Sequence, residues 1–334
     1  MTGLPLSVLD LAPVQEGTRA AEALSATIAL ACRAERFGYH RFWVAEHHNS
    51  PATAGSAPAV LIAALAAATS RIRVGSGGVM LPNHVPLVVA EQFGTLVALA
   101  PDRVDLGVGR GPGTADETTA RALRRGAGPV SAEEYAHDVT TVLGLFTEDS
   151  PAPVLRDGVP EIWLLSSSES GAGLAAGLGL PLSFAHHLRP AATGAALARY
   201  RERFRPSARL DRPRVMVSVE VVCAETDERA DQLMRPADLF EYELTTRWAA
   251  TLPTPQQARA HRLTEHERVF VQERRRWQAV GSPETVARQL ARLTEAVRPD
   301  ELMLTMPVYD PEDRARSLEL VAGLSDVGTA SRCR

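Results

Sequence analysis

Polar residues follow several apolar segments of the chain at the points where those segments end. One segment ends in Glu46, His47 and His48, and a later one ends in His186 and His187. Imidazole and carboxylate groups can transfer protons or bind metal ions. Because neighbouring residues on an extended strand point to opposite sides, His47 and His48 do not easily face one ion. The pattern favours one histidine in a pocket and one hydrogen bonded behind it, without a metal.

A second set of residues has the chemistry of an anion site. A serine-rich turn of Ser168, Glu169 and Ser170 stands directly before a small-residue helix, and Arg110 ends a glycine-flanked apolar segment. Free backbone N–H groups at a helix N-terminus bind anions, and a guanidinium can hold phosphate through two bonds. Helix capping alone would explain the serines. Arg110 on the neighbouring predicted strand favours a phosphate site instead.

Two consecutive glycines, Gly77 and Gly78, interrupt a segment that otherwise has the pattern of a strand. Glycine weakens strands and often marks a bulge or the close approach of another group. A flat ring laid against the backbone would need such a surface.

The elements that position these residues alternate between strand and helix. The alternation predicts a (β/α)8 TIM barrel, an α/β fold in which catalytic groups gather at the C-terminal ends of the strands. A doubly wound sheet is the alternative, but no GxGxxG motif follows the first strand as that fold requires. The eight predicted strands cover residues 6–12, 40–45, 72–81, 104–108, 161–165, 182–185, 215–223 and 301–307.

One long segment lies between the last two predicted strands of this single domain, which spans residues 1–334. Residues 236–280 within it are charged and rich in arginine. Such a composition is typical of solvated helices. A long insertion at this position also often covers the mouth of a barrel, so a lid is the second interpretation.

The composition excludes several classes of protein. The 334 residues carry a formal net charge of −4, which favours neither nucleic-acid binding nor an acidic tail. All 36 basic residues are arginine, so no lysine can form a Schiff base with a substrate or pyridoxal phosphate. Three cysteines without CxxC spacing predict no disulfide framework and no zinc site. No secretion signal or membrane span is expected, and we predict a cytoplasmic protein.

The polar strand ends, in their order and spacing, resemble the bacterial luciferase-like (LLM class) family of flavin-dependent monooxygenases. Gly109 stands where luciferase itself has a cysteine, so light emission is not implied. The loop after Arg110 resembles the branch that contains natural-product tailoring enzymes. The similar segments are residues 42–48, 74–82, 90–91, 102–111, 168–170, 280–284 and 300–303.

The resemblance implies a cofactor, a reaction and partners. Reduced FMN from a separate NAD(P)H:flavin reductase would react with O2 to give a C4a-(hydro)peroxide, which inserts one oxygen atom into an organic substrate. It also implies a homodimer. A dehydrogenase or reductase using F420, or a flavin-binding barrel without turnover, stays open as an alternative.

The resemblance also implies roles for the residues described above. His47 would act as acid or base beside the flavin, and His48, His186 and His187 would line the substrate pocket. Gly77 and Gly78 would form a bulge, often with a cis peptide bond, against the isoalloxazine ring. The implied cofactor-binding residues are Ser76, Gly77, Gly78, Arg110, Ser168, Glu169 and Ser170.

Overall fold

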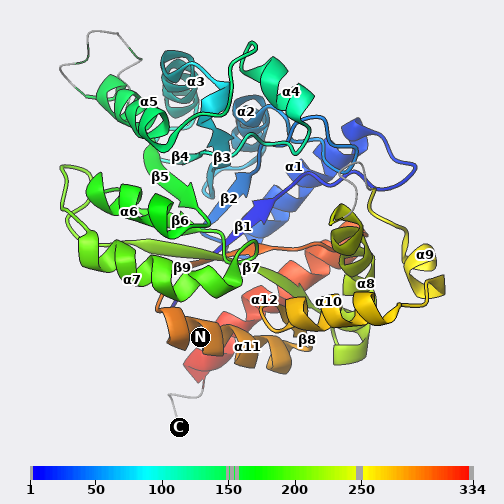
Figure 1. Cartoon of the computed structure of the whole chain (residues 1–334). Coiled ribbons are helices and arrows are strands. Elements are labelled where there is room, and N and C mark those ends of the chain that lie inside the picture. The colour runs from blue at the N-terminus through cyan, green and yellow to red at the C-terminus, as the bar shows by residue number, and fades with distance from the viewer. Residues whose placement is uncertain (1–2, 148–149, 151–153, 155–157, 246–250, 331–334) are drawn as a thin grey trace.

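Eight parallel strands close into a barrel in the computed structural model (Figure 1), which describes residues 3–147, 150, 154, 158–245 and 251–330. Each of the eight predicted strands corresponds to one barrel strand, so the predicted (β/α)8 TIM barrel is confirmed. The barrel strands are β1 (Leu6–Asp10), β2 (Arg41–Val44), β3 (Arg73–Met80), β4 (Val104–Gly109), β5 (Glu161–Ser166), β6 (Leu182–Phe184), β7 (Val215–Cys223) and β9 (Glu301–Thr305).

Strand pairing follows the chain from β1 to β7, and β9 closes the ring between β7 and β1. One strand lies outside the ring. The C-terminal part of β7 extends beyond its pairing with β9 and pairs instead with β8 (Ala279–Gly281). The sequence analysis did not predict β8, because three residues carry too little periodicity to identify a strand.

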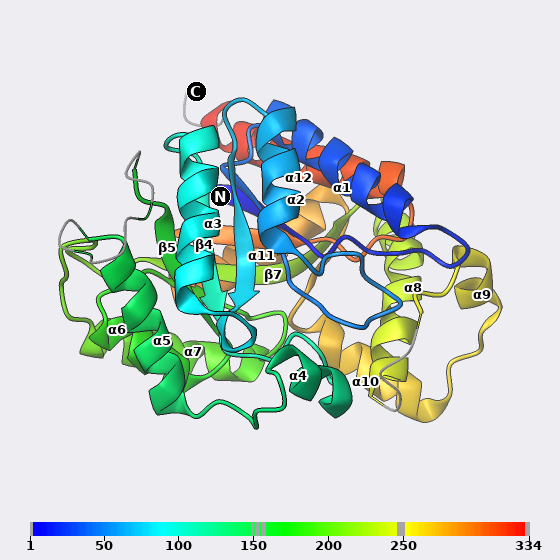
Figure 2. The same cartoon turned by 90° about the horizontal axis from the view of Figure 1, so that it is seen from above.

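Helices surround the barrel, and Figure 2 shows α1, α2, α3 and α12 along one side of it. Buried apolar residues between strands and helices form the main core. The helices are α1 (Ala20–Arg36), α2 (Pro58–Ala68), α3 (Pro86–Leu99), α4 (Glu117–Leu123), α5 (Ala132–Leu145), α6 (Glu169–Gly177), α7 (Thr193–Arg203), α8 (Asp227–Leu244), α9 (Pro255–Ala260), α10 (Glu265–Arg275), α11 (Pro283–Val297) and α12 (Pro311–Ala330).

A second, smaller core fills the inside of the barrel. Trp43 and Trp163 meet edge to face, with ring centroids 5.8 Å apart, and pack with Leu9, Met216 and Met303. Residues of β7 alternate between the two cores, so that Met216 faces the interior of the barrel while Val215 and Val217 face the helices.

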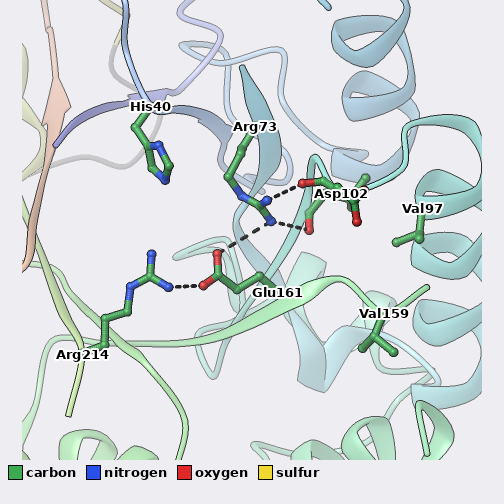
Figure 3. Close-up of a pocket in the computed structure, with 8 residues that line it drawn as sticks. His40, Arg73, Val97, Asp102, Val159, Glu161 and Arg214 are labelled. Carbon is green, nitrogen blue, oxygen red and sulfur yellow. Dashed lines mark hydrogen bonds and ion pairs between the residues drawn. The ribbon is translucent and has the colours of Figure 1, made fainter. Parts of the chain in front are cut away.

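Charged side chains close the N-terminal end of the barrel. Arg41 is fully buried and bonds Asp105 at 2.7 Å, Glu161 at 3.1 Å and Glu301 at 2.7 Å. A hollow of about 450 Å³ lies at this end, and Figure 3 shows Arg214 and Glu161 paired within it. Because the predicted site residues follow the opposite ends of the strands, this hollow is separate from them.

The segment predicted as an insertion forms part of α8, all of α9 and α10, and β8. Its predicted start at residue 236 falls inside α8, because the helix continues through the buried Pro236. Residues 246–250 lie outside the described residues. In Figure 1, α8, α9 and α10 lie together on one side of the barrel. No helix in the described ranges is long and apolar enough to cross a membrane.

Candidate active site

Glu46 joins the ends of strands β2 and β3 through three hydrogen bonds. Its Oε1 lies 2.8 Å from Nε2 of both His48 and His84, and its Oε2 accepts the backbone N–H of Met80 at 3.0 Å. Burial opposes ionisation of this carboxyl, but the bonds from the two histidines outweigh it and lower the pKa of Glu46 to about 2. The buried carboxylate is therefore ionised and fixed in position.

His47, the predicted acid or base, follows Glu46 directly. Its backbone N–H donates to the carbonyl of Gly55 at 2.8 Å, whereas its buried Nδ1 has no partner among the described residues. Burial lowers the pKa of His47, although the Glu46 carboxylate partly opposes that effect. The imidazole is therefore neutral near pH 7 and can accept or donate a proton.

The predicted bulge is present in β3. The register between β3 and β4 shifts between Gly77 and Val79, and the Gly77–Gly78 peptide bond is cis. A Cβ on Gly77 would lie 2.6 Å from Cδ1 of Leu9, and a Cβ on Gly78 would lie 2.8 Å from the carbonyl oxygen of Gly107. Neither position has room for a side chain, because neighbouring atoms of the protein already fill the space where the Cβ would lie.

The serine-rich turn forms the N-terminus of α6. Ser168 is the N-cap residue, and its Oγ accepts the backbone N–H of Gly171 at 3.3 Å and lies 3.1 Å from Oγ of Ser170. Glu169 and Ser170 are exposed. Helix capping and an anion site are therefore both compatible with this turn, because the first N–H groups of a helix lack partners within it.

Arg110 lies at the neighbouring strand end. Strands β4 and β5 pair as far as Val108 and Leu164; Arg110 follows β4, and the serine turn follows β5. No hydrogen bond links Arg110 to any residue in the described ranges, the serine turn included. Arg110 is exposed. Arg110 and Arg124 both line a hollow of about 390 Å³. Convergence of Arg110 and the serine turn on one phosphate stays a prediction.

His187 follows strand β6, opposite β2 in the ring of eight strands. Its Nδ1 lies 2.6 Å from Oγ of Ser218, and its backbone N–H donates to the carbonyl of Ser218 at 3.2 Å. Burial is the main cause that lowers the pKa of His187 to about 3, and the nearby His186, Arg274 and His47 contribute. The ring is therefore neutral.

Three other predicted residues have side chains engaged by the protein. His48 is bonded to Glu46, and His186 lies with its Nδ1 2.8 Å from Oγ1 of Thr193. The buried hydroxyl of Ser76 donates to the carbonyl of Gly107 at 2.9 Å and accepts its N–H at 3.0 Å. The side chain of Ser76 is thus not free for a ligand, and only its backbone could contribute.

Three linked polar residues near the end of β7 were not predicted from the sequence. Glu220 extends from β7 and is bonded by Arg274 of α10 at 2.9 Å. Gln278 donates a hydrogen bond from Nε2 to the same carboxylate, and its buried Oε1 has no partner in the described part of the chain. Glu220 is the only charged residue of strand β7, and this was the available signal. Arg274 and Gln278 come from the insertion, where composition indicates nothing about contacts.

These residues fit a phosphate-bearing flavin. The described chain offers a guanidinium without a hydrogen bond after β4, a helix start with two hydroxyls after the paired strand β5, two consecutive glycines in β3, and a neutral imidazole with an unpartnered nitrogen. Within the described ranges, no group of three His, Cys, Asp or Glu side chains is arranged to hold a metal ion.

Three close relatives cover almost the whole chain. The uncharacterized protein YvbT of Bacillus subtilis (strain 168) is 42% identical, with 95% of each chain covered. A luciferase-like monooxygenase of Escherichia coli (strain K12) is 40% identical, with 97% of each chain covered. The crystal structure of apo-MsnO8 is 38% identical, covers 97% of this chain and 99% of its own, and superposes with a TM-score of 0.90.

More distant proteins differ in cofactor. An N-acetyl-S-alkylcysteine monooxygenase of B. subtilis is 34% identical over 98% of this chain and 99% of its own. Two more distant solved structures share the fold alone. One is the oxygenating constituent of 3,6-diketocamphane monooxygenase in complex with FMN (TM-score 0.68, 21% identity), and the other is an F420-dependent secondary alcohol dehydrogenase (TM-score 0.67, 16% identity).

The family model for luciferase-like monooxygenases matches residues 4–298. The chain therefore belongs to the luciferase-like monooxygenase family and is an oxidoreductase.

Proposed function

We propose that the protein is an FMN-dependent monooxygenase that inserts one oxygen atom of O2 into a small organic substrate. The observation that supports this proposal is the pairing of β4 with β5, because Arg110 follows β4 and the N-terminus of α6 follows β5. Gly77 and Gly78 lie in β3, which pairs with both β4 and β2, and His47 follows β2.

Each predicted residue has a distinct role in this proposal. Arg110, Ser168 and Ser170 hold the phosphate, with the backbone of Glu169. The glycines support the isoalloxazine ring. Reduced FMN, when bound, would supply the electrons that activate O2. His47, neutral and buried at Nδ1, holds or releases the proton that the oxygen transfer requires, and its burial limits the access of water.

A separate NAD(P)H:flavin reductase is the proposed source of reduced FMN, because the chain has no GxGxxG motif after its first strand for a nicotinamide dinucleotide. We place the protein in the cytoplasm, where free thiols such as Cys32 and Cys223 stay reduced. Secondary metabolism, indicated by the loop after Arg110, is the proposed setting.

The cofactor is tested by measuring oxygen transfer with two reduced cofactors. The purified chain receives FMNH2 from an added reductase and NADH or, in parallel, reduced F420, with N-acetyl-S-methylcysteine as first probe, after the relative that acts on such thioethers. We expect ¹⁸O from ¹⁸O2 in the sulfoxide with FMNH2 only. Reduction of the probe by reduced F420, without ¹⁸O incorporation, would favour the F420 alternative.

Binding tests the phosphate site without any substrate. Arg110→Ala should weaken FMN binding roughly 10- to 100-fold, because a charge-assisted hydrogen bond is lost. Arg121→Ala, which changes an exposed arginine of α4, is the matched control. An unchanged FMN dissociation constant in the Arg110 variant would reject the assignment.

A further inference from the structure

Two inward-facing residues of β7 each orient one hydrogen-bond acceptor at the barrel mouth. Ser218 and Glu220 lie two residues apart on the same face as Met216, which packs inside the barrel. Ser218 contacts His187, and Glu220 contacts Gln278. Neither contact uses the second polar atom of its partner, so His187 Nε2 and Gln278 Oε1 stay without a bond to either residue.

The Ser218 contact selects one tautomer of His187. The Ser218 hydroxyl donates to the carbonyl of Phe184 at 3.2 Å and lies 2.6 Å from Nδ1 of His187. A hydroxyl has one proton, so both contacts are hydrogen bonds only when Nδ1 of His187 carries the ring proton. Nε2 then has a free lone pair and is an acceptor.

The Glu220 contact selects one orientation of Gln278. A carboxylate only accepts hydrogen bonds, so the amide nitrogen of Gln278 must face it. Oε1 is left buried without a partner in the described chain, in a residue that is 7% exposed. A buried carbonyl without a partner is costly, and a donor from a ligand would satisfy it.

The two acceptors lie in adjoining segments. Trp277, next to Gln278, has its ring edge-on to His186 with centroids 6.0 Å apart, and Arg274 influences the titration of His187. Arg274 is bonded to both Glu220 and Glu241, so its one positive charge is shared between two carboxylates and offsets only part of the charge behind Gln278. The wall formed by His187 and Gln278 therefore presents two lone pairs beside a partly neutralised carboxylate.

We propose, building on the proposed monooxygenase function, that His187 Nε2 and Gln278 Oε1 bind the N–H or O–H donors of a neutral substrate group such as a primary amide or a hydroxyl. These two residues determine specificity and orient the substrate against His47, which stands on the opposite side of the barrel. A carboxylate group would be repelled at this wall, because both atoms are acceptors.

¹⁵N NMR of the histidine-labelled full chain tests the proposal, with and without added FMN. Assigned with a His187→Gln variant, the His187 signals should show a protonated Nδ1 and an unprotonated Nε2. Benzamide, which has two N–H donors, should shift the Nε2 signal at up to tens of millimolar, and N,N-dimethylbenzamide should not. An Nε2–H tautomer, equal shifts from both compounds, or no shift from either would each overturn the proposal.

Substitutions test the contribution of each acceptor to benzamide binding. Gln278→Met keeps the length of the side chain but loses the carbonyl, and should weaken benzamide binding about fivefold. Gln272→Met, on the exposed side of α10, is the matched control. Ser218→Ala should convert His187 to a mixture of tautomers. Equal benzamide affinities in the two methionine variants would remove Gln278 from the site. Because benzamide is neither cofactor nor oxidant, these results are independent of whether FMN binds.

Discussion

His47 and Glu46 are neighbours in the sequence, yet their surroundings give them opposite charge states. Hydrogen bonds keep Glu46 ionised, whereas burial keeps His47 neutral. Only the imidazole can therefore exchange a proton near pH 7. His47→Ala should leave the FMN dissociation constant unchanged and lower turnover about 100-fold or more, the usual contribution of general acid–base catalysis. Stopped-flow binding and product analysis on the same preparation measure both quantities, and full product formation would refute the role.

Glu46 should stabilise the folded protein as well as hold the ends of β2 and β3 together. Its pKa is about 2 in the folded chain against 4.5 for an ordinary glutamate, so the unfolded chain binds more protons between these pH values. The contribution of Glu46 to the free energy of unfolding is therefore fully present above pH 4.5 and is lost as the pH falls toward 2. Glu46→Gln should cost about 2 kcal/mol at neutral pH, because an amide cannot accept three hydrogen bonds.

Urea unfolding at several pH values checks this expectation. The difference in unfolding free energy between wild type and Glu46→Gln should shrink as the pH falls below 4.5. Glu133→Gln, in the exposed first turn of α5, should change stability little at any pH. A constant difference between wild type and the Glu46 variant would show that the carboxylate is not held by these histidines.

Strands β3 and β4 approach each other so closely that a single methyl group should disturb them. A Cβ on Gly107 would lie 2.2 Å from the carbonyl oxygen of Ser76 and 2.7 Å from Cδ1 of Leu165. The first of these atoms is backbone and cannot rotate away. Gly107→Ala should therefore cost about 3 kcal/mol or more. Gly323→Ala, in α12 with no atom near the new Cβ, should stabilise by roughly 0.5 to 1 kcal/mol. Thermal unfolding of the two variants compares them, and similar melting temperatures would contradict the close approach.

Arg274 links helix α10 to strand β7 of the barrel. Arg274 bonds Glu220 of β7 and Glu241 of α8, whereas Arg276 is 69% exposed and bonds only its neighbour Glu273. Arg274→Ala leaves two carboxylates without a cation, so amide exchange in α10 should become at least about tenfold faster. Arg276→Ala should leave exchange unchanged. Equal protection of α10 in both variants would mean that other contacts hold this helix, such as the ion pairs of Arg275 with Asp231 and Asp238 of α8, whether or not residues 236–280 serve as a lid.

The elements that could be predicted are those with a long local signal. Apolar runs bounded by turns identify the barrel strands, and Ser131 with Glu134 form the capping box that their spacing predicts. Contacts between distant residues carry no such signal. Arg41 and Glu301 pair across the barrel floor, and β8 pairs with β7. Among site residues, His47 and Arg110 follow predicted strands, whereas Gln278 approaches the site only because α8 and α10 fold back.

At the scale of the whole molecule, one face suggests a second copy of the chain. Helices α2 and α3 pack side by side on the outside of the barrel (Figure 2), and both expose valines, Val60 at 73% and Val88 at 44%. Helix α2 contains no charged residue at all. An apolar face of this kind is stabilised when a partner covers it. We therefore expect the proposed homodimer to form through α2 and α3, with the two faces related by twofold symmetry.

Charge placed on this face should dissociate the dimer. In a symmetric interface each substitution occurs on both chains, so Val60→Glu together with Val88→Glu buries four carboxylates without partners. The double variant should sediment as a monomer at concentrations where wild type sediments as a dimer. Val269→Glu adds the same charge to a half-exposed valine of α10 and should remain dimeric. A monomeric wild type would refute the homodimer, and a dimeric double variant would place the interface on another face, since neither chain could then bury α2 against its partner.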